Sequence, residues 1–359
     1  MNLLYVFPEE WTGRRAREVH TLKTCAALAG AGVGVCLVTA GGKKDLAEGI
    51  LRADEFPAGL TVAPLSRRIG PMKSSLIFGW HLRRWLKDRP AFDVVYCIHL
   101  KAARILNRIH VPYWWEAHEI FSETPSRGSK KEKQLSDMEK SVIANAAGRI
   151  ATSQALADAL NKLYFPSPKP FHIVPNAGDH PLKNSVTDPK GPLVYCGSLA
   201  EWKGLPVVLE AAGGLDLPVR IVGGTKKEWN ELAARHLSDR ARKGIDWKPR
   251  VDSYLLPQMI SGCRAGLVPT LPETGSGRYS CPMKLFDYAR CGLPVVTSAL
   301  PALASLNVGR WCRQVKENSA QAWQQALTEH PLDGAQALQW AAEFTWSKRA
   351  ERILRAFSG

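Results

Sequence analysis

The sequence lacks the cysteine patterns that mark disulfide frameworks and metal sites. Its eight cysteines contain no Cys-x-x-Cys pair, and no two histidines stand at metal-ligand spacing. A free cysteine in an apolar stretch behaves as a small hydrophobic residue, and reduced cysteines are typical of the cytosol. We therefore expect a cytoplasmic protein that holds no structural zinc ion.

Long apolar runs are also missing. Residues 1–7 are apolar, but no basic segment precedes them and Pro8-Glu9-Glu10 follows, which is unlike a signal peptide. The longest uncharged run, residues 24–42, contains five glycines. It fits a helix end, a turn and a short strand better than a membrane span of about 20 apolar residues. We expect a chain that does not span a membrane.

Acidic residues are scarce relative to basic ones. The chain has 48 Lys and Arg against 33 Asp and Glu, a net charge of +15. This excess favours an acidic partner, which means phosphate groups, an anionic membrane surface or nucleic acid. The length of 359 residues predicts about two domains at roughly 150 residues per domain.

Strand and helix patterns alternate in both halves of the chain, which predicts parallel sheets covered by helices. In the first half, helical spacing covers residues 16–29, and the expected strands are residues 3–7, 33–39, 94–98, 111–115 and 149–152, the last closing the sheet. Residues 164–192 hold seven prolines, which suits a connector. The alternation then restarts with strands expected at residues 193–196, 219–222, 266–268 and 295–296 and helices at 205–212, 228–236, 284–290 and 347–357.

The segment of residues 280–296 combines a helix start with a turn and a strand. Ser280 is placed to cap the helix, and Pro282 fits its first turn. A helix start offers free N–H groups and a positive dipole end, which suit a phosphate. Asp287 lies one turn after Lys284, where a carboxylate can accept hydrogen bonds from ribose hydroxyls. The alternative is a capped surface helix whose Asp287 faces solvent.

Two further segments place polar side chains after strands, where ligands of open α/β sheets bind. Residues 193–204 form a strand and a glycine-containing loop that ends with Lys203, a cation suited to a diphosphate. The loop differs from a P-loop, because Gly-x-x-x-x-Gly-Lys-Ser/Thr does not occur. His118 follows the strand of residues 111–115 between two acids and is suited to contact a sugar or transfer a proton. The alternatives are a solvated lysine and a structural histidine.

These three segments, in this order, resemble the retaining GT-B glycosyltransferases of the large family often called family 4. Residues 280–296 track its pattern S-P-x-K-L-F-E-Y-x-A-x-G-x-P-V-V with few changes. Matching segments also lie at residues 7–14, 172–179, 197–204 and 345–352, so the resemblance covers nearly the whole chain.

The resemblance implies two Rossmann-like α/β domains that face each other across a cleft. The expected domains are an acceptor domain at residues 1–178, a donor domain at 179–340, and a last helix at 341–359 that packs back on the first domain. The implied activity is transfer of a sugar from a nucleoside diphosphate sugar, with retained configuration, to a glycan or lipid-linked acceptor of cell-envelope polysaccharide or glycolipid biosynthesis. No cofactor is expected. The chain has no Asp-x-Asp, so a metal-independent reaction is expected.

The resemblance also implies roles for particular residues. His118 would approach the donor sugar from the first domain, and the loop at Gly13 and Arg14 would face the donor phosphates or the acceptor. Residues 247–250 are the expected loop near the base. The residues implied in donor binding are Gly197, Ser198, Lys203, Arg278, Ser280, Met283, Lys284 and Asp287.

The sequence departs from the family at two places. Members often carry two cations near the donor diphosphate, and here those positions are Ser198 and Trp202, with Arg278 as a substitute. The usual pair of glutamates is also absent, because Asp287 fills the second place and Tyr279 stands eight residues earlier. A catalytically weak or inactive partner subunit is therefore the alternative to an active enzyme.

The excess of positive charge is concentrated in residues 67–108, which contain ten Lys and Arg and two acids. Residues 76–87 have helical spacing. Phe78, Leu82, Trp85 and Leu86 share one face, and the other face carries Trp80, Arg83, Arg84 and Lys87. An aromatic ring within a basic face suits the headgroup zone of an anionic membrane. We expect peripheral contact with the inner face of the cell membrane, and a helix packed on the first sheet with a solvated basic face is the alternative.

A nucleic-acid-binding protein is the remaining alternative. The net charge favours it, but no helix-turn-helix, zinc-finger or RNP-like aromatic pattern is present. We therefore expect no nucleic-acid partner.

Overall fold

The structure is a computed structural model of the whole chain, and it describes residues 1–13, 15–41, 50–51, 56–184, 186–329 and 332–359. The chain divides into two compact units. Unit 1 comprises Met1–Pro175 together with Trp346–Gly359, and unit 2 comprises Asn176–Thr345. Each unit has its own sheet, so the expected pair of α/β domains is confirmed.

Unit 1 is built on a seven-stranded parallel sheet in the order β3-β2-β1-β6-β7-β8-β9. Its strands are β1 (Asn2–Phe7), β2 (Gly34–Thr39), β3 (Leu60–Pro64), β6 (Val94–Cys97), β7 (Trp114–Ala117), β8 (Gly148–Ala151) and β9 (His172–Ile173). Two sequence predictions are wrong in detail. The strand expected at residues 111–115 begins only at Trp114, and β8 does not close the sheet because β9 pairs with its outer side.

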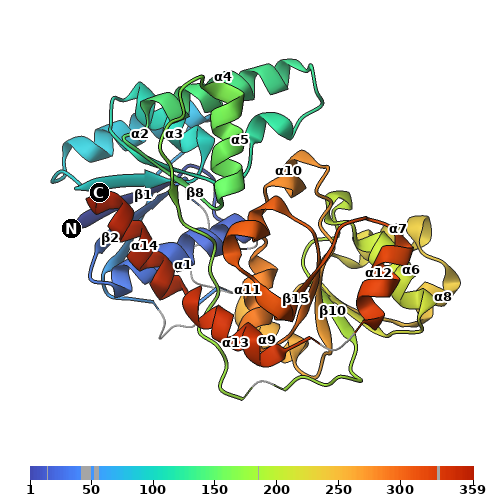
Figure 1. Cartoon of the computed structure of the whole chain (residues 1–359). Helices are drawn as coiled ribbons and strands as arrows, with labels where there is room; N and C mark the ends of the chain where they lie inside the picture. Colours follow the sequence, from blue (N-terminus) through green and yellow to red (C-terminus); the bar gives the residue numbers. More distant parts are fainter. Residues whose placement is uncertain (14, 42–49, 52–55, 185, 330–331) are drawn as a thin grey trace. The chain divides into compact units, whose positions relative to one another are not determined.

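Helices surround this sheet, and each buries an apolar stripe against the sheet or against a neighbouring helix. They are α1 (Ala16–Gly30), α2 (Ser75–Lys87), α3 (Leu100–Arg108), α4 (Lys130–Asn145), α5 (Gln154–Tyr164) and α14 (Trp346–Ser358). The C-terminal helix α14 lies beside α1 (Figure 1), and its Ala350, Ile353 and Ala356 belong to the same core as Leu3 and Tyr5 of β1. The last helix is therefore an integral part of unit 1.

Unit 2 repeats the design with a six-stranded parallel sheet in the order β12-β11-β10-β13-β14-β15. Its strands are β10 (Leu193–Cys196), β11 (Val219–Val222), β12 (Ile245–Lys248), β13 (Ala265–Val268), β14 (Val295–Ser298) and β15 (Cys312–Val315). The prediction of a loop at residues 247–250 is wrong in part, because Trp247 and Lys248 belong to the edge strand β12.

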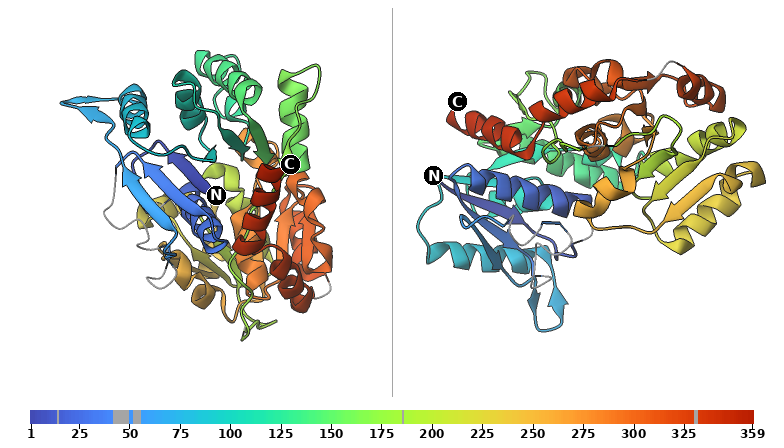
Figure 2. Two further views of the ribbon diagram at one scale, coloured as in Figure 1. Left: turned by 90° about the vertical axis from the view of Figure 1, so that its left-hand side faces the viewer. Right: turned by 90° about the horizontal axis from the view of Figure 1, so that it is seen from below.

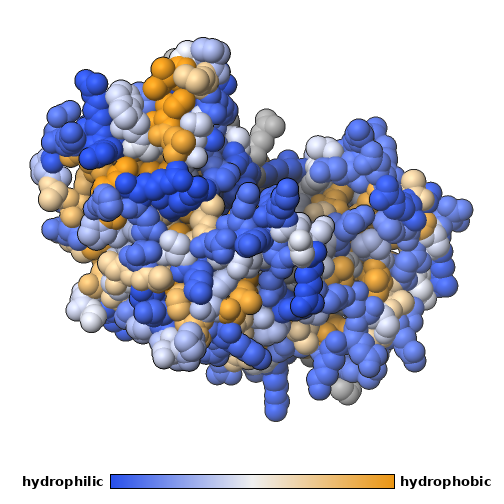
Figure 3. Space-filling model, turned by 90° about the horizontal axis from the view of Figure 1, so that it is seen from above, coloured by the Kyte–Doolittle hydropathy of each residue, from blue (hydrophilic) through white to orange (hydrophobic). Residues whose placement is uncertain are grey.

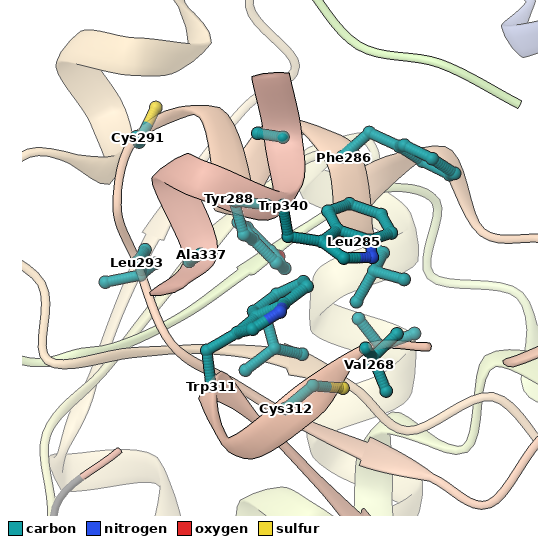
Figure 4. Packing of buried hydrophobic residues seen from close by; sticks show 14 of the residues in the cluster. Val268, Leu285, Phe286, Tyr288, Cys291, Leu293, Trp311, Cys312, Ala337 and Trp340 are labelled. Carbon is teal, nitrogen blue, oxygen red and sulfur yellow. The ribbon is translucent and has the colours of Figure 1, made fainter. Parts of the chain in front are cut away.

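The helices of unit 2 border two clusters of buried apolar side chains, one of which is rich in aromatic rings. They are α6 (Leu205–Gly214), α7 (Lys226–His236), α8 (Asp239–Lys243), α9 (Leu256–Ile260), α10 (Gly275–Arg278), α11 (Met283–Arg290), α12 (Ala320–Thr328) and α13 (Gly334–Glu343). Trp340 of α13 lies between Phe286 of α11 and Trp311, with ring centroids 5.2 and 4.9 Å away (Figure 4). This cluster fixes α11 against α13.

The strand order reverses direction in both sheets. In unit 1 the reversal lies between β1 and β6, and in unit 2 it lies between β10 and β13. In open α/β sheets, ligands bind beyond the carboxyl ends of the strands at such a reversal. The loops that follow these strands are therefore the first places to look for a site in each unit.

A short hairpin of β4 (Arg68–Ile69) and β5 (Met72–Lys73) precedes α2 and projects from unit 1 (Figure 2). On the face drawn in Figure 3, hydrophilic side chains predominate and apolar ones form separate patches among them. Among the described residues, no helix has the length and hydropathy needed to cross a membrane.

Candidate functional site

In unit 2, the loops after β10 and β13 meet at the reversal of strand order. The backbone N–H of Leu271 donates to the carbonyl oxygen of Trp202 over 2.9 Å. Gly204 adopts φ of +64°, and a Cβ at this position would lie 2.0 Å from the carbonyl oxygen of Pro269. Only glycine fits so close an approach in this conformation, so the two loops form one fixed platform.

Two lysines of the predicted donor site lie on this platform. The amino group of Lys203, in the 3₁₀ turn Glu201–Lys203, lies 3.5 Å from the ring centroid of Trp202. The amino group of Lys284, in the first turn of α11, lies 4.0 Å from the ring centroid of Tyr195. A Cβ on Gly197 would come within 3.0 Å of the Lys284 nitrogen. Lys284 therefore reaches back under the loop that follows β10.

Tyr195 of β10 fixes the loop between β10 and Lys203, because its hydroxyl donates to the carbonyl oxygen of Ser198 over 2.6 Å. A second tie joins this strand to α11, because the backbone N–H of Cys196 donates to the hydroxyl of Tyr288 over 2.8 Å. These bonds fix Gly197 and Ser198 relative to the start of α11.

The start of α11 differs from the sequence prediction. Pro282 occupies the N-cap and no side chain caps the helix, which begins at Met283. The predictions that Ser280 is the cap and that Pro282 lies in the first turn are therefore wrong. Ser280 instead lies between α10 and α11, and its N–H donates to the carbonyl oxygen of Gly277 over 3.1 Å. A start without a side-chain cap leaves backbone N–H groups for a ligand.

The rest of the predicted donor site lies on the same helices. Asp287 is half-buried, one turn after Met283 and Lys284, and Arg278 ends α10. The segment before α11 is held by the amide of Asn176, which donates to the carbonyl oxygen of Cys281 over 2.6 Å. The structure thus brings Gly197, Ser198 and Lys284 close together and places the other predicted donor residues on the adjoining 3₁₀ turn, on α10 and α11, and between these two helices.

In unit 1, His118 follows β7, and its imidazole is held by a buried carboxylate. His118 Nε2 lies 2.6 Å from Glu116 Oε1, and the His118 side chain is 25% exposed whereas that of Glu116 is fully buried. Glu116 also accepts a hydrogen bond from the Tyr96 hydroxyl and pairs with the guanidinium of Arg349. His118 is therefore the solvent-facing end of a buried network.

The charge of Glu116 is balanced within unit 1. Burial raises the pKa of Glu116, but the Arg349 guanidinium and the imidazoles of His118 and His20 outweigh it and hold that pKa well below its usual range. Candidate metal ligands on His20, Glu116 and His118 lie within 4.8 Å of one another. Because Arg349 pairs with the same Glu116 oxygen that His118 contacts, the carboxylate already has a cationic partner. The cluster is an ion-pair network that orients His118.

The loop after β1 contains the predicted residues Gly13 and Arg14. Gly13 adopts φ of +70°, and Arg14 lies outside the described residues. The buried Glu18 fixes this loop by accepting hydrogen bonds from the backbone N–H groups of Thr12 and Arg15, each over 3.0 Å. These bonds hold Thr12 and Arg15 in place after the first strand.

A charged cluster next to this loop was not predicted from the sequence. Arg15 and Arg17 lie 2.6 and 3.5 Å from Glu9, and these cations and His99 hold the pKa of Glu9 below its usual range although burial raises it. Burial lowers the pKa of His99 to about 4. The sequence analysis also missed Arg349, because a pairing across 233 residues leaves no local pattern. Glu116 stood two residues before His118 and was the one available signal.

Comparisons with known proteins agree with this geometry. A model of the glycosyl transferase 4-like domain matches residues 16–177, and a model of the glycosyl transferases group 1 domain matches residues 191–330. No curated protein matches this chain by sequence.

Solved structures share the fold over the full chain. Alr3699/HepE of Anabaena, solved in complex with UDP and glucose, has a TM-score of 0.71 at 14% identity and covers 100% of this chain and 99% of its own. WaaG, a glycosyltransferase involved in lipopolysaccharide biosynthesis, has a TM-score of 0.69 at 15% identity, covering 99% and 100%. TarM has a TM-score of 0.71 at 9% identity, covering 100% and 99%.

Two parallel-sheet Rossmann-like units of this kind define the GT-B fold of glycosyltransferases. Both matched domains, the glycosyl transferase 4-like domain and the glycosyl transferases group 1 domain, are glycosyltransferase domains, and they follow one another along the chain. The resemblance noted in the sequence is thereby confirmed, and the protein is a glycosyltransferase.

Proposed function

We propose that this glycosyltransferase moves a sugar from a nucleoside diphosphate sugar to a glycan or lipid-linked acceptor of the cell envelope. We also propose that configuration is retained and that no metal ion takes part. The observation that carries the donor assignment is the pair of lysines, Lys203 and Lys284, beside the uncapped start of α11. Cations and free N–H groups at a reversal of strand order are the combination that holds a diphosphate.

The other donor contacts follow from the same geometry. Gly197 and Ser198 would offer backbone to the phosphates, together with the N–H groups of Met283 and Lys284. Asp287, half-buried on α11, would accept hydrogen bonds from the ribose. Arg278 and Ser280 adjoin the start of the same helix and are proposed to contact the phosphates.

For unit 1 we propose that His118 contacts the donor sugar. Its support is the contact with Glu116 at 2.6 Å, which orients the ring while a quarter of the side chain stays exposed. The loop at Gly13 is proposed to face the phosphates or the acceptor. Because the bond to Glu116 restricts ring rotation, a substrate would meet a preorganised imidazole.

Nucleotide binding tests the donor assignment directly. Melting temperatures would be measured with UDP, GDP, ADP, dTDP and CDP, with UDP first because the HepE structure holds it. A ligand at about a hundred times its dissociation constant adds roughly 2.7 kcal/mol of stability. We expect one nucleotide to raise the melting temperature and Lys203→Ala to reduce the rise. The control variant Lys227→Ala, which changes an exposed lysine of α7, should leave the rise intact. If none of the five stabilises the protein, the inactive-subunit reading replaces this proposal.

Retention and metal independence have their own tests. Once a donor is found, NMR of the product reports the anomeric configuration, which we expect to match that of the donor. Activity should survive excess EDTA, and loss that is restored by a divalent cation would contradict the metal-independent reaction. Neither result bears on the donor site itself.

A surface of unit 1 supports the proposed contact with a membrane. Trp80 of α2 is 52% exposed, and Arg83, Arg84 and Lys87 are exposed on the same helix while Phe78 and Leu82 are buried. The adjoining hairpin adds exposed Ile69 and Met72, and residues 56–87 contain no acid. Exposed apolar and basic side chains together favour an anionic lipid surface.

Vesicle co-sedimentation tests this surface. We expect binding to vesicles that contain anionic lipid and not to neutral ones, and we expect the triple change of Arg83, Arg84 and Lys87 to Ser to reduce it. A matched control changes three exposed cations of α4 in the same unit, Lys130, Lys131 and Lys133, to Ser. Equal binding by both triple variants would rule out α2 as the contact, and a preference for nucleic acid over vesicles would favour the polyanion reading.

A further inference from the structure

The amino group of Lys284 is a buried nitrogen without a hydrogen-bond partner among the described residues. The residue is 9% exposed, and its nitrogen lies against the Tyr195 ring at 4.0 Å and under Gly197. An ammonium group in such a place has lost its water and gained only the face of one ring. Its protonation is therefore costly in the free protein.

The charged and titratable groups around Lys284 do not offset the free-energy cost of protonating it. Burial and the neighbouring Lys203 lower the pKa of Lys284 well below its usual range, and Asp287 and Cys196 oppose this only in part. Burial raises the pKa of the Cys196 thiol to about 12, so it stays neutral. Burial also raises the pKa of Tyr195, and its hydroxyl is committed to Ser198. Within the described part of the chain, the charged groups that act on Lys284 are the Lys203 ammonium and the Asp287 carboxylate.

A diphosphate bound at this platform would favour the protonated form of Lys284 over the neutral amine. It would bring several negative charges next to a low-dielectric site, where their effect on an amine is large. The backbone on both sides is fixed by the Leu271 to Trp202 bond and by the tie from Cys196 to Tyr288. The site therefore responds to the ligand by changing protonation more readily than by rearranging its loops.

We propose that a nucleoside diphosphate binds to unit 2 together with one proton, which is taken up by the amino group of Lys284. This inference rests on the donor site proposed above. The proton leaves the buffer and ends on the Lys284 nitrogen, and no covalent bond of the ligand changes. It follows that affinity falls as the pH rises, because binding consumes a proton. The dissociation constant then increases by up to tenfold for each pH unit while the free amine is unprotonated.

Calorimetry with UDP tests the proposal. The binding enthalpy would be measured at about pH 8 in HEPES and in Tris, two buffers with different ionisation enthalpies and no phosphate to compete for the site. This pH lies well above the pKa of about 6 of a terminal phosphate, so the nucleotide is already fully ionised. We expect the apparent enthalpy to differ between the buffers by an amount that corresponds to uptake approaching one proton per UDP bound.

Variants of Lys284 and Lys203 distinguish the roles of the two lysines. Lys284→Arg carries a permanent charge, so we expect UDP to bind without buffer-dependent enthalpy. Lys203→Met should bind UDP more weakly and still take up a proton. A third experiment needs no variant. In the wild-type protein, the dissociation constant of UDP should rise between about pH 7 and about pH 9, because binding consumes a proton as long as the free amine is unprotonated.

The outcomes distinguish this inference from the proposed function. Binding of UDP with equal enthalpies in both buffers and no dependence on pH overturns the proton uptake and leaves the donor site standing. Uptake that persists in Lys284→Arg also overturns it, since the proton would then go elsewhere. If UDP and the other four nucleotides all fail to bind, both the donor site and the proton uptake are refuted.

Discussion

The buried ion pair between Arg349 and Glu116 yields the sharpest prediction about unit 1. Arg349 is 1% exposed and Glu116 is fully buried. The guanidinium also donates to the carbonyl oxygen of Pro175 over 3.1 Å and to Thr24 Oγ1 over 3.3 Å. Arg349→Met keeps most of the apolar volume but removes the permanently charged partner of the buried carboxylate, which then retains only its contacts with Tyr96, His118 and His20. We expect the free energy of unfolding to fall by about 3–5 kcal/mol, the cost of breaking a buried pair.

A double-mutant cycle isolates the pair. Glu116→Gln keeps the shape of the side chain and removes its charge, so it leaves Arg349 as the unpaired ion. The double variant contains neither charge and should cost clearly less than the sum of the single changes, because replacing a buried pair entirely is often near neutral. We expect a coupling energy of about 2–3 kcal/mol, at the upper end of the range for residues in contact.

The same pair predicts a dependence on pH. The pKa of Glu116 is lowered in the folded state, so its stabilising effect is complete above the unfolded pKa of about 4.3. The effect is lost as the pH falls through the folded-state pKa. Below about pH 4, the free energy of unfolding should therefore fall more steeply for the wild type than for Glu116→Gln. The difference in unfolding free energy between the two proteins should become smaller as the pH falls.

Urea unfolding followed by circular dichroism measures these quantities near neutral pH. Arg355→Met is the matched control, because Arg355 lies on the same helix with an exposed side chain, and we expect a change within about 0.5 kcal/mol. Two results would refute the reasoning: a cost for Arg349→Met no larger than that of Arg355→Met, or single-variant costs that add to within about 0.5 kcal/mol.

Three further predictions concern the rest of the molecule. Gly204→Ala should destabilise unit 2, because its Cβ would meet the Pro269 carbonyl oxygen at 2.0 Å in a left-handed conformation; a melting temperature equal to that of the wild type would contradict this. Trp340→Ala should lower the free energy of unfolding by about 3–5 kcal/mol, because it leaves a cavity between the rings of Phe286 and Trp311. Urea unfolding measures this loss, and a value under about 1 kcal/mol would show that the cluster is not well packed. A thiol reagent should label at most Cys36 rapidly in the native protein, since the other seven cysteines are buried, and all eight in urea; rapid native labelling of several thiols would show that those sites open.

The sequence predicted the strands and helices that lie in the core of each unit. Residues 3–7 and 193–196 were expected as strands and form β1 and β10, because their apolar residues are buried between layers of helices. Edge strands were missed or misplaced. β9 has two residues, and β12 alternates partly buried with exposed residues, so neither carries the apolar run that marked the others. Hydrophobic pattern identifies interior strands and says little about edges.

The candidate sites also contain residues that local sequence identifies and residues that it does not. Lys203, Lys284 and His118 could be proposed from the sequence because each lies after a strand or in the first turn of a helix, a position that local sequence reveals. The role of Glu116 required Arg349, which lies 233 positions away along the chain. The cap of α11 was misassigned because Ser280 is a good capping residue in isolation, whereas the short α10 ends two residues before it and α11 starts at Met283. Tertiary placement, rather than propensity, decided these cases.

The two units share one topology, but the basic side chains near the carboxyl ends of their strands have different partners. In unit 1, Arg15 and Arg349 each pair with a carboxylate, Glu9 and Glu116 respectively. In unit 2, the amino group of Lys284 lies against an aromatic face. An aromatic face stabilises an ammonium group by only about 0.5–2 kcal/mol, much less than a buried carboxylate does, so Lys284 still needs an anion to stabilise its charged form. Arg15 and Arg349 therefore hold the structure of unit 1, whereas Lys284 of unit 2 can respond to a phosphorylated ligand, which is why we place donor binding on unit 2.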